Sequence, residues 1–319
     1  MKLLSFIIPS YNCSSFLEKC VGSLVHPDVR KDIEILIIND GSTDDTLAVA
    51  QKLQQADPDI VRVISQENRG HGGALNTGCA AAKGKYLKVI DADDWIETQE
   101  LPRFLEVLRT CDSDVVLTHH YTRDISTGEV KKWKSYPEAF ERAYTMDEIM
   151  ACPKNFERSL TFHGITYRTD FYHQKGMKLS ERVFYEDHEY ATVPCCYAQS
   201  VTPVDLFLYD YRIGDVQQSV SDANQLRRLS HVETVLGRFI TEYAALSLPQ
   251  SSGGRAFFEM KAQGLLLSYM TTVMLVEPNR KKGRQLGEAM MNRFRQQMNG
   301  AYERSQKQYK IFRIMNRLH

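Results

Sequence analysis

Short apolar segments alternate with amphipathic segments along the first ninety residues. Strands are predicted where a short run is apolar on both faces, at residues 3–8, 33–38, 60–65 and 86–90. Helices are predicted between these strands, at residues 14–25, 43–56 and 73–83. This order is typical of an α/β fold with a mostly parallel sheet flanked by helices, because strands in parallel sheets are covered on both faces.

The pattern changes twice after the first hundred residues. Further strands are predicted at residues 114–119, 161–167 and 204–211, with a hairpin-like stretch around Thr127 and Gly128 and a helix beginning near Glu186. From residue 224 onward the pattern is only helical and predicts three or four amphipathic helices. We therefore predict an α/β domain at residues 1–220 and a smaller helical region at residues 221–319.

Polar and acidic side chains follow three of the predicted parallel strands. They form the segments Pro9-Ser10-Tyr11-Asn12, Asn39-Asp40-Gly41-Ser42 and Asp91-Ala92-Asp93. Ligands of open α/β sheets bind outside the carboxyl ends of the strands. The three segments therefore predict one site at this edge of the sheet.

Three carboxylates within four positions end the apolar run before Trp95. Carboxylates this close raise each other's pKa, and a divalent cation resolves the conflict. Mg²⁺ and Mn²⁺ take one or two carboxylates together with substrate phosphates. Asp91 and Asp93 would share one such ion and its nucleotide. The alternative is an acidic turn that caps the next helix, with Asp94 at the helix N-terminus.

Candidate nucleotide contacts lie on the neighbouring strand ends. Tyr11 would stack on a base, and Asp40 would accept a hydrogen bond from a uracil N–H or a ribose hydroxyl. The alternative for Asp40 is an Asx-turn, with Ser42 or Thr43 capping the following helix. The glycine-rich segment 68–73 precedes a predicted helix at 74–83. A glycine-rich turn before a helix N-terminus suits a phosphate, so Asn68 and the permanently charged Arg69 are further candidate contacts of the donor.

Three other nucleotide-binding classes lack their motifs in this chain. The G-x-G-x-x-G fingerprint of nicotinamide-binding enzymes should follow the first strand, where Pro-Ser-Tyr-Asn stands instead. A P-loop is also absent. The glycine-rich, arginine-containing loop of sugar-1-phosphate nucleotidyltransferases is missing after the first strand as well.

The motifs together resemble the family 2 glycosyltransferases, which have the GT-A fold. The resemblance rests on four segments in order, SFIIPSYN at 5–12, IINDGSTDDT at 37–46, QENRG at 66–70 and DADDW at 91–95, and is looser as far as about residue 220. It implies a nucleotide-sugar donor, usually a UDP-sugar, a divalent metal (Mn²⁺ or Mg²⁺) and inversion at the anomeric carbon. It also implies nucleoside contacts for Pro9, Tyr11 and Asp40, a place near the ribose or donor sugar for Asp91, and metal binding by Asp93.

An inverting transfer needs a base for the acceptor hydroxyl. The segment FYEDHE at 184–189 resembles the acidic pair that lies late in the family's catalytic domain. We predict Asp187 as the base, with Glu186 as the alternative or as a structural partner. The competing explanation is a helix N-terminus enriched in acids. Arg212 and the polar loop behind it would close over the diphosphate and exclude water, unless this is a surface loop without such a role.

These observations predict a metal-dependent inverting glycosyltransferase of the hexosyltransferase class. The acceptor would be a hydroxyl in a surface polysaccharide, teichoic acid, glycolipid or glycoprotein glycan. The alternative is a non-catalytic sugar-nucleotide-binding subunit that supports a partner transferase. The intact acidic sets at 91–93 and 186–187 argue against that alternative.

Composition and charge indicate in which compartment the protein works and what it contacts. The chain is 43% apolar and 25% charged, as in ordinary soluble domains, and its seven cysteines form no C-x-x-C pair. We therefore predict reduced cysteines and a cytoplasmic protein, with no partner nucleic acid. Residues 280–319 carry eleven Lys or Arg and two Glu, a net charge of +9, so residues 1–279 carry −9. This basic tail would contact the inner face of a membrane, or it is a solvated helical face. The helices at 224–276 would form either the face of a homo-oligomer or a platform for the acceptor.

Overall fold

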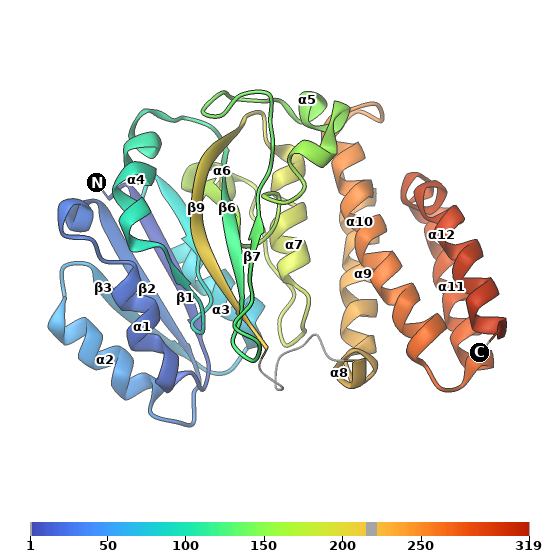
Figure 1. The fold of residues 1–319 in the computed structure, drawn as a ribbon, viewed down its shortest axis with the longest axis horizontal. Helices are drawn as coiled ribbons and strands as arrows, with labels where there is room; N and C mark the ends of the chain where they lie inside the picture. The colour runs from blue at the N-terminus through green and yellow to red at the C-terminus, as the bar shows by residue number, and fades with distance from the viewer. Residues whose placement is uncertain (1, 215–221, 319) are drawn as a thin grey trace. The chain divides into compact units, whose positions relative to one another are not determined.

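A nine-stranded sheet is the centre of the first of two structural units in the computed structural model, which describes residues 2–214 and 222–318 (Figure 1). The strand order is β3-β2-β1-β4-β8-β6-β9-β5, and β7 pairs with β6. The strands are β1 (Leu4–Ser10), β2 (Ile33–Asp40), β3 (Val61–Gln66), β4 (Tyr86–Val89), β5 (Trp95–Ile96), β6 (Val115–Asp124), β7 (Val130–Trp133), β8 (Ile165–Arg168) and β9 (Val201–Ile213).

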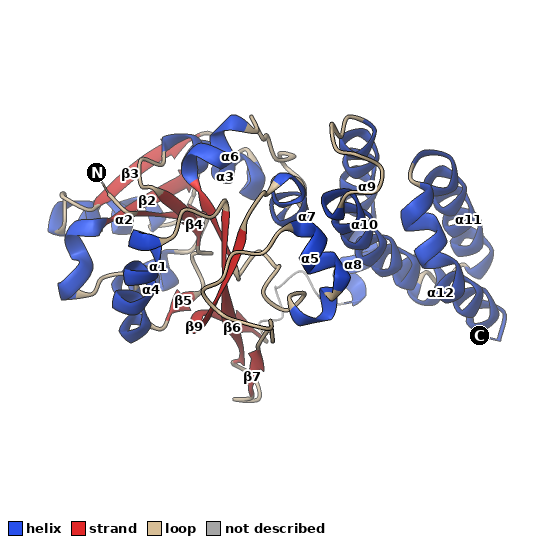
Figure 2. Ribbon diagram, turned by 90° about the horizontal axis from the view of Figure 1, so that it is seen from above, coloured by secondary structure: helices blue, strands red, loops and turns tan. Residues whose placement is uncertain are grey.

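Helices cover both faces of the sheet (Figure 2). In the first unit they are α1 (Ser14–Ser23), α2 (Thr46–Ala56), α3 (Gly70–Ala81), α4 (Leu101–Thr110), α5 (Met146–Ala151) and α6 (Thr169–Gln174). On one face, alternate β1 residues such as Phe6 pack with Leu17 of α1 and Phe104 of α4. On the other face, α3 lies so close that a Cβ on Gly78 would collide with the side chain of Ile7. Successive β1 side chains therefore serve opposite layers.

The predicted α/β class is confirmed, and β3, β2, β1 and β4 are neighbouring parallel strands. Beyond β4 the sheet adds antiparallel pairs that were not predicted, because β8 runs antiparallel to both β4 and β6. The strand predicted at 161–167 was wrong at its start. Residues 161–164 form a turn in which Gly164 and Ile165 both donate to Thr161 O, so the strand begins at Ile165.

The second unit contains residues 187–197 together with the described residues from 222 onward. Its helices are α7 (Asp187–Thr192), α8 (Asp222–Arg227), α9 (Leu229–Ala244), α10 (Gly253–Thr271), α11 (Arg280–Gln297) and α12 (Asn299–Leu318). A short π-helical segment, Thr272–Val276, continues α10. α10 packs against α9 and α12, and the buried ring of Phe258 on α10 contacts that of Phe239 on α9.

Two findings concern the state of the cysteines and the possibility of a membrane-spanning helix. All seven cysteines lie in the described residues, and none is bonded to another. In the described part of the chain, no helix combines the length and the apolar character that crossing a bilayer requires.

Candidate functional site

The polar segments predicted from three strand ends meet at one edge of the sheet. Ser10 of β1 pairs with Asn39 of β2, and Asp40 of β2 pairs with Gln66 of β3. On the other side of β1, β4 runs parallel to it and leads into Asp91. The register thus brings the carboxyl ends of the four parallel strands together, where α/β sheets bind their ligands.

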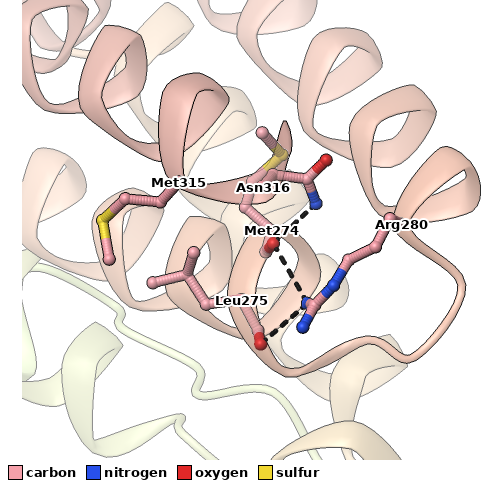
Figure 3. Close-up of a pocket in the computed structure, with 5 residues that line it drawn as sticks. All are labelled: Met274, Leu275, Arg280, Met315 and Asn316. Carbon is pink, nitrogen blue, oxygen red and sulfur yellow. Dashed lines mark hydrogen bonds between the residues drawn. The ribbon is translucent and has the colours of Figure 1, made fainter. Parts of the chain in front are cut away.

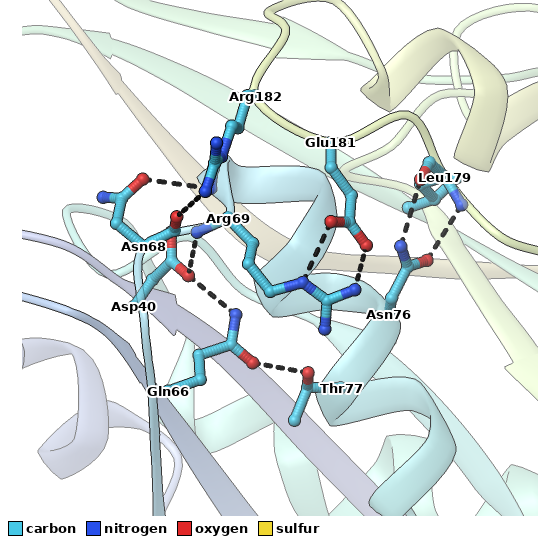
Figure 4. Close-up of polar contacts among 10 residues, drawn as sticks. Asp40, Gln66, Asn68, Arg69, Asn76, Thr77, Leu179, Glu181 and Arg182 are labelled. Carbon is cyan, nitrogen blue, oxygen red and sulfur yellow. Dashed lines mark hydrogen bonds and ion pairs between the residues drawn. The ribbon is translucent and has the colours of Figure 1, made fainter.

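Asp40 is buried at this edge and has one unsatisfied oxygen (Figure 4). Its Oδ1 accepts from Gln66 Nε2 at 2.7 Å and from the Arg69 backbone N–H at 2.9 Å. Its Oδ2 accepts no hydrogen bond from the described residues. The Asx-turn alternative for Asp40 is wrong, because Asn39 Oδ1 accepts from the Ser42 N–H and α2 begins only at Thr46, after Asp45.

Tyr11 lies on a braced loop after β1. Its side chain is 51% exposed, and the preceding Pro9 is buried within the strand. The next residue, Asn12, has a positive φ of 50°, and its Oδ1 accepts from the Thr43 N–H at 2.8 Å. This bond fixes the loop that presents the exposed ring of Tyr11 beside the end of β2.

The three carboxylates after β4 have different surroundings. Asp94 is buried and accepts from Tyr209 Oη at 2.6 Å and from the Arg212 N–H at 2.7 Å, so it anchors β9. Its predicted alternative role as a helix cap is wrong, because β5 follows it and its oxygens are used by β9. Burial, together with the charges of Asp91 and Asp93, holds the pKa of Asp94 well above its usual value.

Asp91 and Asp93 remain partly exposed, with 27% and 37% of their side chains accessible. Burial and the neighbouring charge of Asp91 raise the pKa of Asp93. Arg212 Nη1 lies 3.7 Å from Asp93 Oδ2, and its guanidinium also lies over the ring of Phe16. The structure therefore brings the predicted residues Asp91, Asp93 and Arg212 together.

The two carboxylates fit a divalent cation that completes its shell with substrate oxygens. Mg²⁺ and Mn²⁺ are hard ions that commonly take only one or two protein carboxylates plus phosphates. Across residues 2–214 and 222–318, no group of three or more His, Cys, Asp or Glu is arranged to hold a metal by itself. A cation at Asp91 and Asp93 would therefore depend on a phosphate-bearing ligand.

His71 joins the site although sequence analysis did not single it out. Its Nε2 lies 2.9 Å from Asp91 Oδ1, and its Nδ1 lies 2.5 Å from Glu186 Oε1. Burial opposes protonation of this ring, but the two carboxylates outweigh it and hold the pKa of His71 well above its usual value. The only sequence signal was a histidine inside a glycine-rich segment, and nothing local linked it to Glu186.

The glycine-rich segment accommodates the chain around residues 180–186. A Cβ on Gly72 would collide with Ser180 O and would lie 2.9 Å from Glu186 Cγ. The prediction that α3 begins after these glycines was wrong: the helix starts at Gly70 and includes them. Close approach of the two backbones, which only glycine permits, explains the composition.

Arg69 forms an ion pair and a backbone hydrogen bond with the same segment, residues 180–186 (Figure 4). It forms a two-point ion pair with Glu181, including Nε to Oε2 at 2.9 Å, and its carbonyl accepts from the Arg182 N–H. Arg182 Nη2 also donates to the carbonyl of Asn68 at 3.3 Å. The phosphate contacts expected of Asn68 and Arg69 stay predictions.

The two candidate bases differ in burial and in the structural unit to which each belongs. Glu186 is 3% exposed and belongs to the first unit, while Asp187 is the first residue of α7 and is grouped with the second. Within the second unit, burial lowers the pKa of Lys261 on α10, and the charges of Cys195 and Asp187 partly oppose this.

The loop expected to close behind Arg212 falls largely at 215–221, outside the described residues.

Curated glycosyltransferases match parts of the chain. A glycosyltransferase of Streptococcus pneumoniae named GlyG is 33% identical over 150 residues, 47% of this chain and 49% of its own length. An Escherichia coli chondroitin synthase is 39% identical over 120 residues, 38% of this chain and 17% of its own. An uncharacterized Nostoc glycosyltransferase, alr2836, is 41% identical over 128 residues, 40% of this chain and 38% of its own. The matches thus span less than half the length of these relatives.

Solved structures share the fold across nearly the whole chain. S. aureus TarS 1–349 in complex with UDP-GlcNAc has a TM-score of 0.65 at 18% identity, covering 93% of this chain and 92% of that one. A Pyrobaculum calidifontis mannosyltransferase in complex with GDP-Man and Mn²⁺ has a TM-score of 0.55 at 16% identity, covering 98% and 82%. The model of glycosyl transferase family 2 matches residues 5–174, more than half of the sequence. The chain therefore belongs to glycosyl transferase family 2.

Proposed function

We propose that this protein is a metal-dependent, inverting glycosyltransferase that moves a sugar from a UDP-sugar to an acceptor hydroxyl in the assembly of a surface polysaccharide or teichoic acid. The observation that carries the proposal is the convergence of Asp91, Asp93 and Glu186 beside the ends of the parallel strands. Relatives named for polysaccharide synthesis support the setting. The cytoplasmic location stays a prediction.

The donor would lie across the ends of β1, β2 and β4. Tyr11 would stack on the base, and Asp40 Oδ2 would accept a hydrogen bond from the imide N–H of the base. Because this oxygen is shut off from solvent, binding requires a local rearrangement of the side chains over it. Asp91 would face the ribose or sugar, and Asp93, with Asp91, would hold Mn²⁺ or Mg²⁺. The bound ion would neutralise the leaving diphosphate, and Arg212 would add positive charge beside it.

The chemical step would be a single in-line displacement. The acceptor oxygen bonds to the anomeric carbon while the bond from that carbon to the diphosphate oxygen breaks. The acceptor proton passes to a carboxylate, for which we propose Asp187. Glu186 is the weaker candidate, because it is buried and its Oε1 is engaged by His71. Glu186 would instead hold His71 beside Asp91 within the first unit.

Nucleotide release from a panel of UDP-sugars and GDP-mannose with Mn²⁺ tests this proposal. We expect release from one donor, abolished in Asp93→Ala and reduced about 10²- to 10⁴-fold in Asp187→Ala, the usual range for loss of a general base. Asp59→Ala is the matched control, since Asp59 is exposed at the amino end of β3, away from the site. Donor binding without transfer to any acceptor would support the non-catalytic subunit instead. Absence of metal-dependent nucleotide binding would contradict both.

A further inference from the structure

Helix α12 carries an exposed apolar stripe in addition to its buried face. Ile311, Ile314, Met315 and Leu318 are 40%, 59%, 37% and 76% exposed. Their spacing of three and four residues places them on one face of the helix. The buried face is made by other positions, among them Phe312. A contiguous stripe of this kind marks an interaction surface, whereas single exposed apolar residues do not.

The charged side chains on the same segment of α12 are all positive. Residues 304–318 include five Lys or Arg and no Asp or Glu. All of these cations are exposed, among them Lys307, Lys310, Arg313 and Arg317. An apolar stripe whose own helix segment carries only positive charges is typical of helices that lie in the interface of anionic membranes. Each cation near such a surface strengthens binding about fivefold, which corresponds to ~1 kcal/mol.

A pocket adjoins the stripe in the same unit (Figure 3). Its volume is about 270 Å³, and its lining residues are Met274, Leu275, Arg280, Met315 and Asn316. Met315 belongs to both the stripe and the pocket. Arg280 Nη1 donates to Leu275 O at 2.8 Å, and Asn316 Nδ2 donates to Met274 O at 2.7 Å, so the chain's own carbonyls hold both polar side chains in place. The pocket therefore adds a fixed guanidinium and a methionine thioether at the edge of the stripe.

We propose that α12 docks on an anionic phospholipid surface, with its apolar stripe at the boundary of headgroups and acyl chains and its cations on lipid phosphates. The combination of exposed apolar residues with the exclusively positive charge of residues 304–318 carries the proposal. A stripe that packed against another protein would need the apolar residues, but it would not need a segment in which every charge is positive. The proposal does not depend on glycosyl transfer.

Sedimentation of the full chain with vesicles tests the proposal. The vesicles are phosphatidylcholine alone or with about 30 mol% phosphatidylglycerol, at about 0.05 M and about 0.5 M NaCl. We expect binding only to the anionic vesicles and mainly at low salt. Ile314→Gln with Leu318→Gln should weaken it at least tenfold. Lys310→Gln with Arg317→Gln should weaken it about 25-fold, from two cations at about fivefold each.

Two matched double variants control for loss of apolar area and of charge elsewhere. Ile125→Gln with Val130→Gln removes exposed apolar side chains of the first unit, and Lys31→Gln with Lys52→Gln removes exposed cations there. Both should bind like the unaltered chain. Equal loss in the control and α12 variants, or no binding at all, would overturn the proposal. Dissociation of an oligomer by Ile314→Gln with Leu318→Gln in the absence of lipid would also overturn it, because the stripe would then be a protein interface.

Discussion

The Oδ2 atom of Asp40 is buried and unpaired, while Oδ1 of the same carboxylate accepts two hydrogen bonds. A buried acceptor without a donor costs about 1–3 kcal/mol. An imide N–H of a nucleobase would remove this cost on binding. The internal bonds of Oδ1 hold the carboxylate in the orientation that such a contact requires.

Asp40→Asn should therefore lower the affinity for UDP with Mn²⁺ about 10- to 100-fold, from the loss of a charged acceptor. The amide oxygen can still accept from Gln66 and Arg69, so thermal stability should change little. The new NH₂ group opposes the uracil N–H but suits the acceptor N3 of cytosine. Calorimetry with UDP and CDP would check this, and an unchanged preference for UDP would place the base away from Asp40.

His71 connects two carboxylates that belong to opposite sides of the proposed reaction. Asp91 lies on the donor side, and Glu186 precedes the proposed base. Groups that share one hydrogen-bond network lose their function together, so their substitutions are not additive.

Substitutions of His71 and Glu186 should show this coupling. His71→Gln and Glu186→Gln should each lower kcat about 10- to 100-fold and leave the Kd for UDP with Mn²⁺ within about threefold, because both act through the position of other groups. The double variant should be little worse than either single one. Steady-state kinetics with the donor found in the panel would measure the cycle. Full additivity would show that the contact does not contribute to catalysis.

Lys88 should make stability depend on pH. Burial lowers its pKa to about 7, although Nζ donates to His163 O at 2.8 Å. Between pH 7 and 10 the unfolded chain keeps this proton and the folded chain does not. The free energy of unfolding should then rise with pH, by up to about 1.4 kcal/mol per unit. Urea unfolding of Lys88→Met should lack this slope. An equal slope in both proteins would place the titration elsewhere.

At the scale of elements, the first turn of α3 serves as a platform for the segment that precedes α7. Gly70 has a φ of +76°, and a Cβ there would lie 2.8 Å from the backbone N of Arg182. Asn76 extends the contact with hydrogen bonds to the N–H and the carbonyl of Leu179 (Figure 4). The position of Glu186 thus depends on backbone packing as well as on His71.

Gly72→Ala should disrupt this platform, because the added methyl collides with Ser180 O. We expect a loss of about 1–3 kcal/mol in stability, typical of overpacking, together with reduced transfer activity. Gly22→Ala in α1 is the matched control, since nothing lies within 4 Å of its Cβ position. That change should stabilise the chain by about 0.4–1 kcal/mol. Equal stability of the two variants in urea unfolding would contradict the packing explanation.

At the scale of the whole molecule, metal and nucleotide should stabilise the fold more when added together than their separate effects would sum to. Two protein carboxylates are a weak site alone, and the diphosphate completes the coordination shell. Mn²⁺ and UDP added together should therefore raise the Tm by several degrees, more than the sum of their separate effects, through mass action on the folded state. Differential scanning fluorimetry would measure this, with EDTA as the reversal. Asp93→Ala should abolish the excess shift, and its persistence would exclude Asp93 as a ligand.

The parallel half of the sheet was predictable because its signals are local. Strands such as β1 are apolar on both faces, and a helix follows each of β1, β2 and β3 within a few residues. The rule that ligands bind at the carboxyl ends of strands then assigns Asp40 and Asp91 to one edge of the sheet from the amino-acid sequence alone. The family resemblance added the roles of these residues, and those roles stay predictions.

The remaining features depend on residues that are distant in sequence. His71 and Glu186 are 115 positions apart, and Tyr209 and Asp94 are also 115 apart. The insertion of β8 beside β4, the glycine contacts of α3 and the anchoring of β9 by Asp94 all arise from such pairs. Local periodicity reports which face of an element is apolar, but not which distant element covers it. Only the folded chain brings these groups within hydrogen-bonding distance.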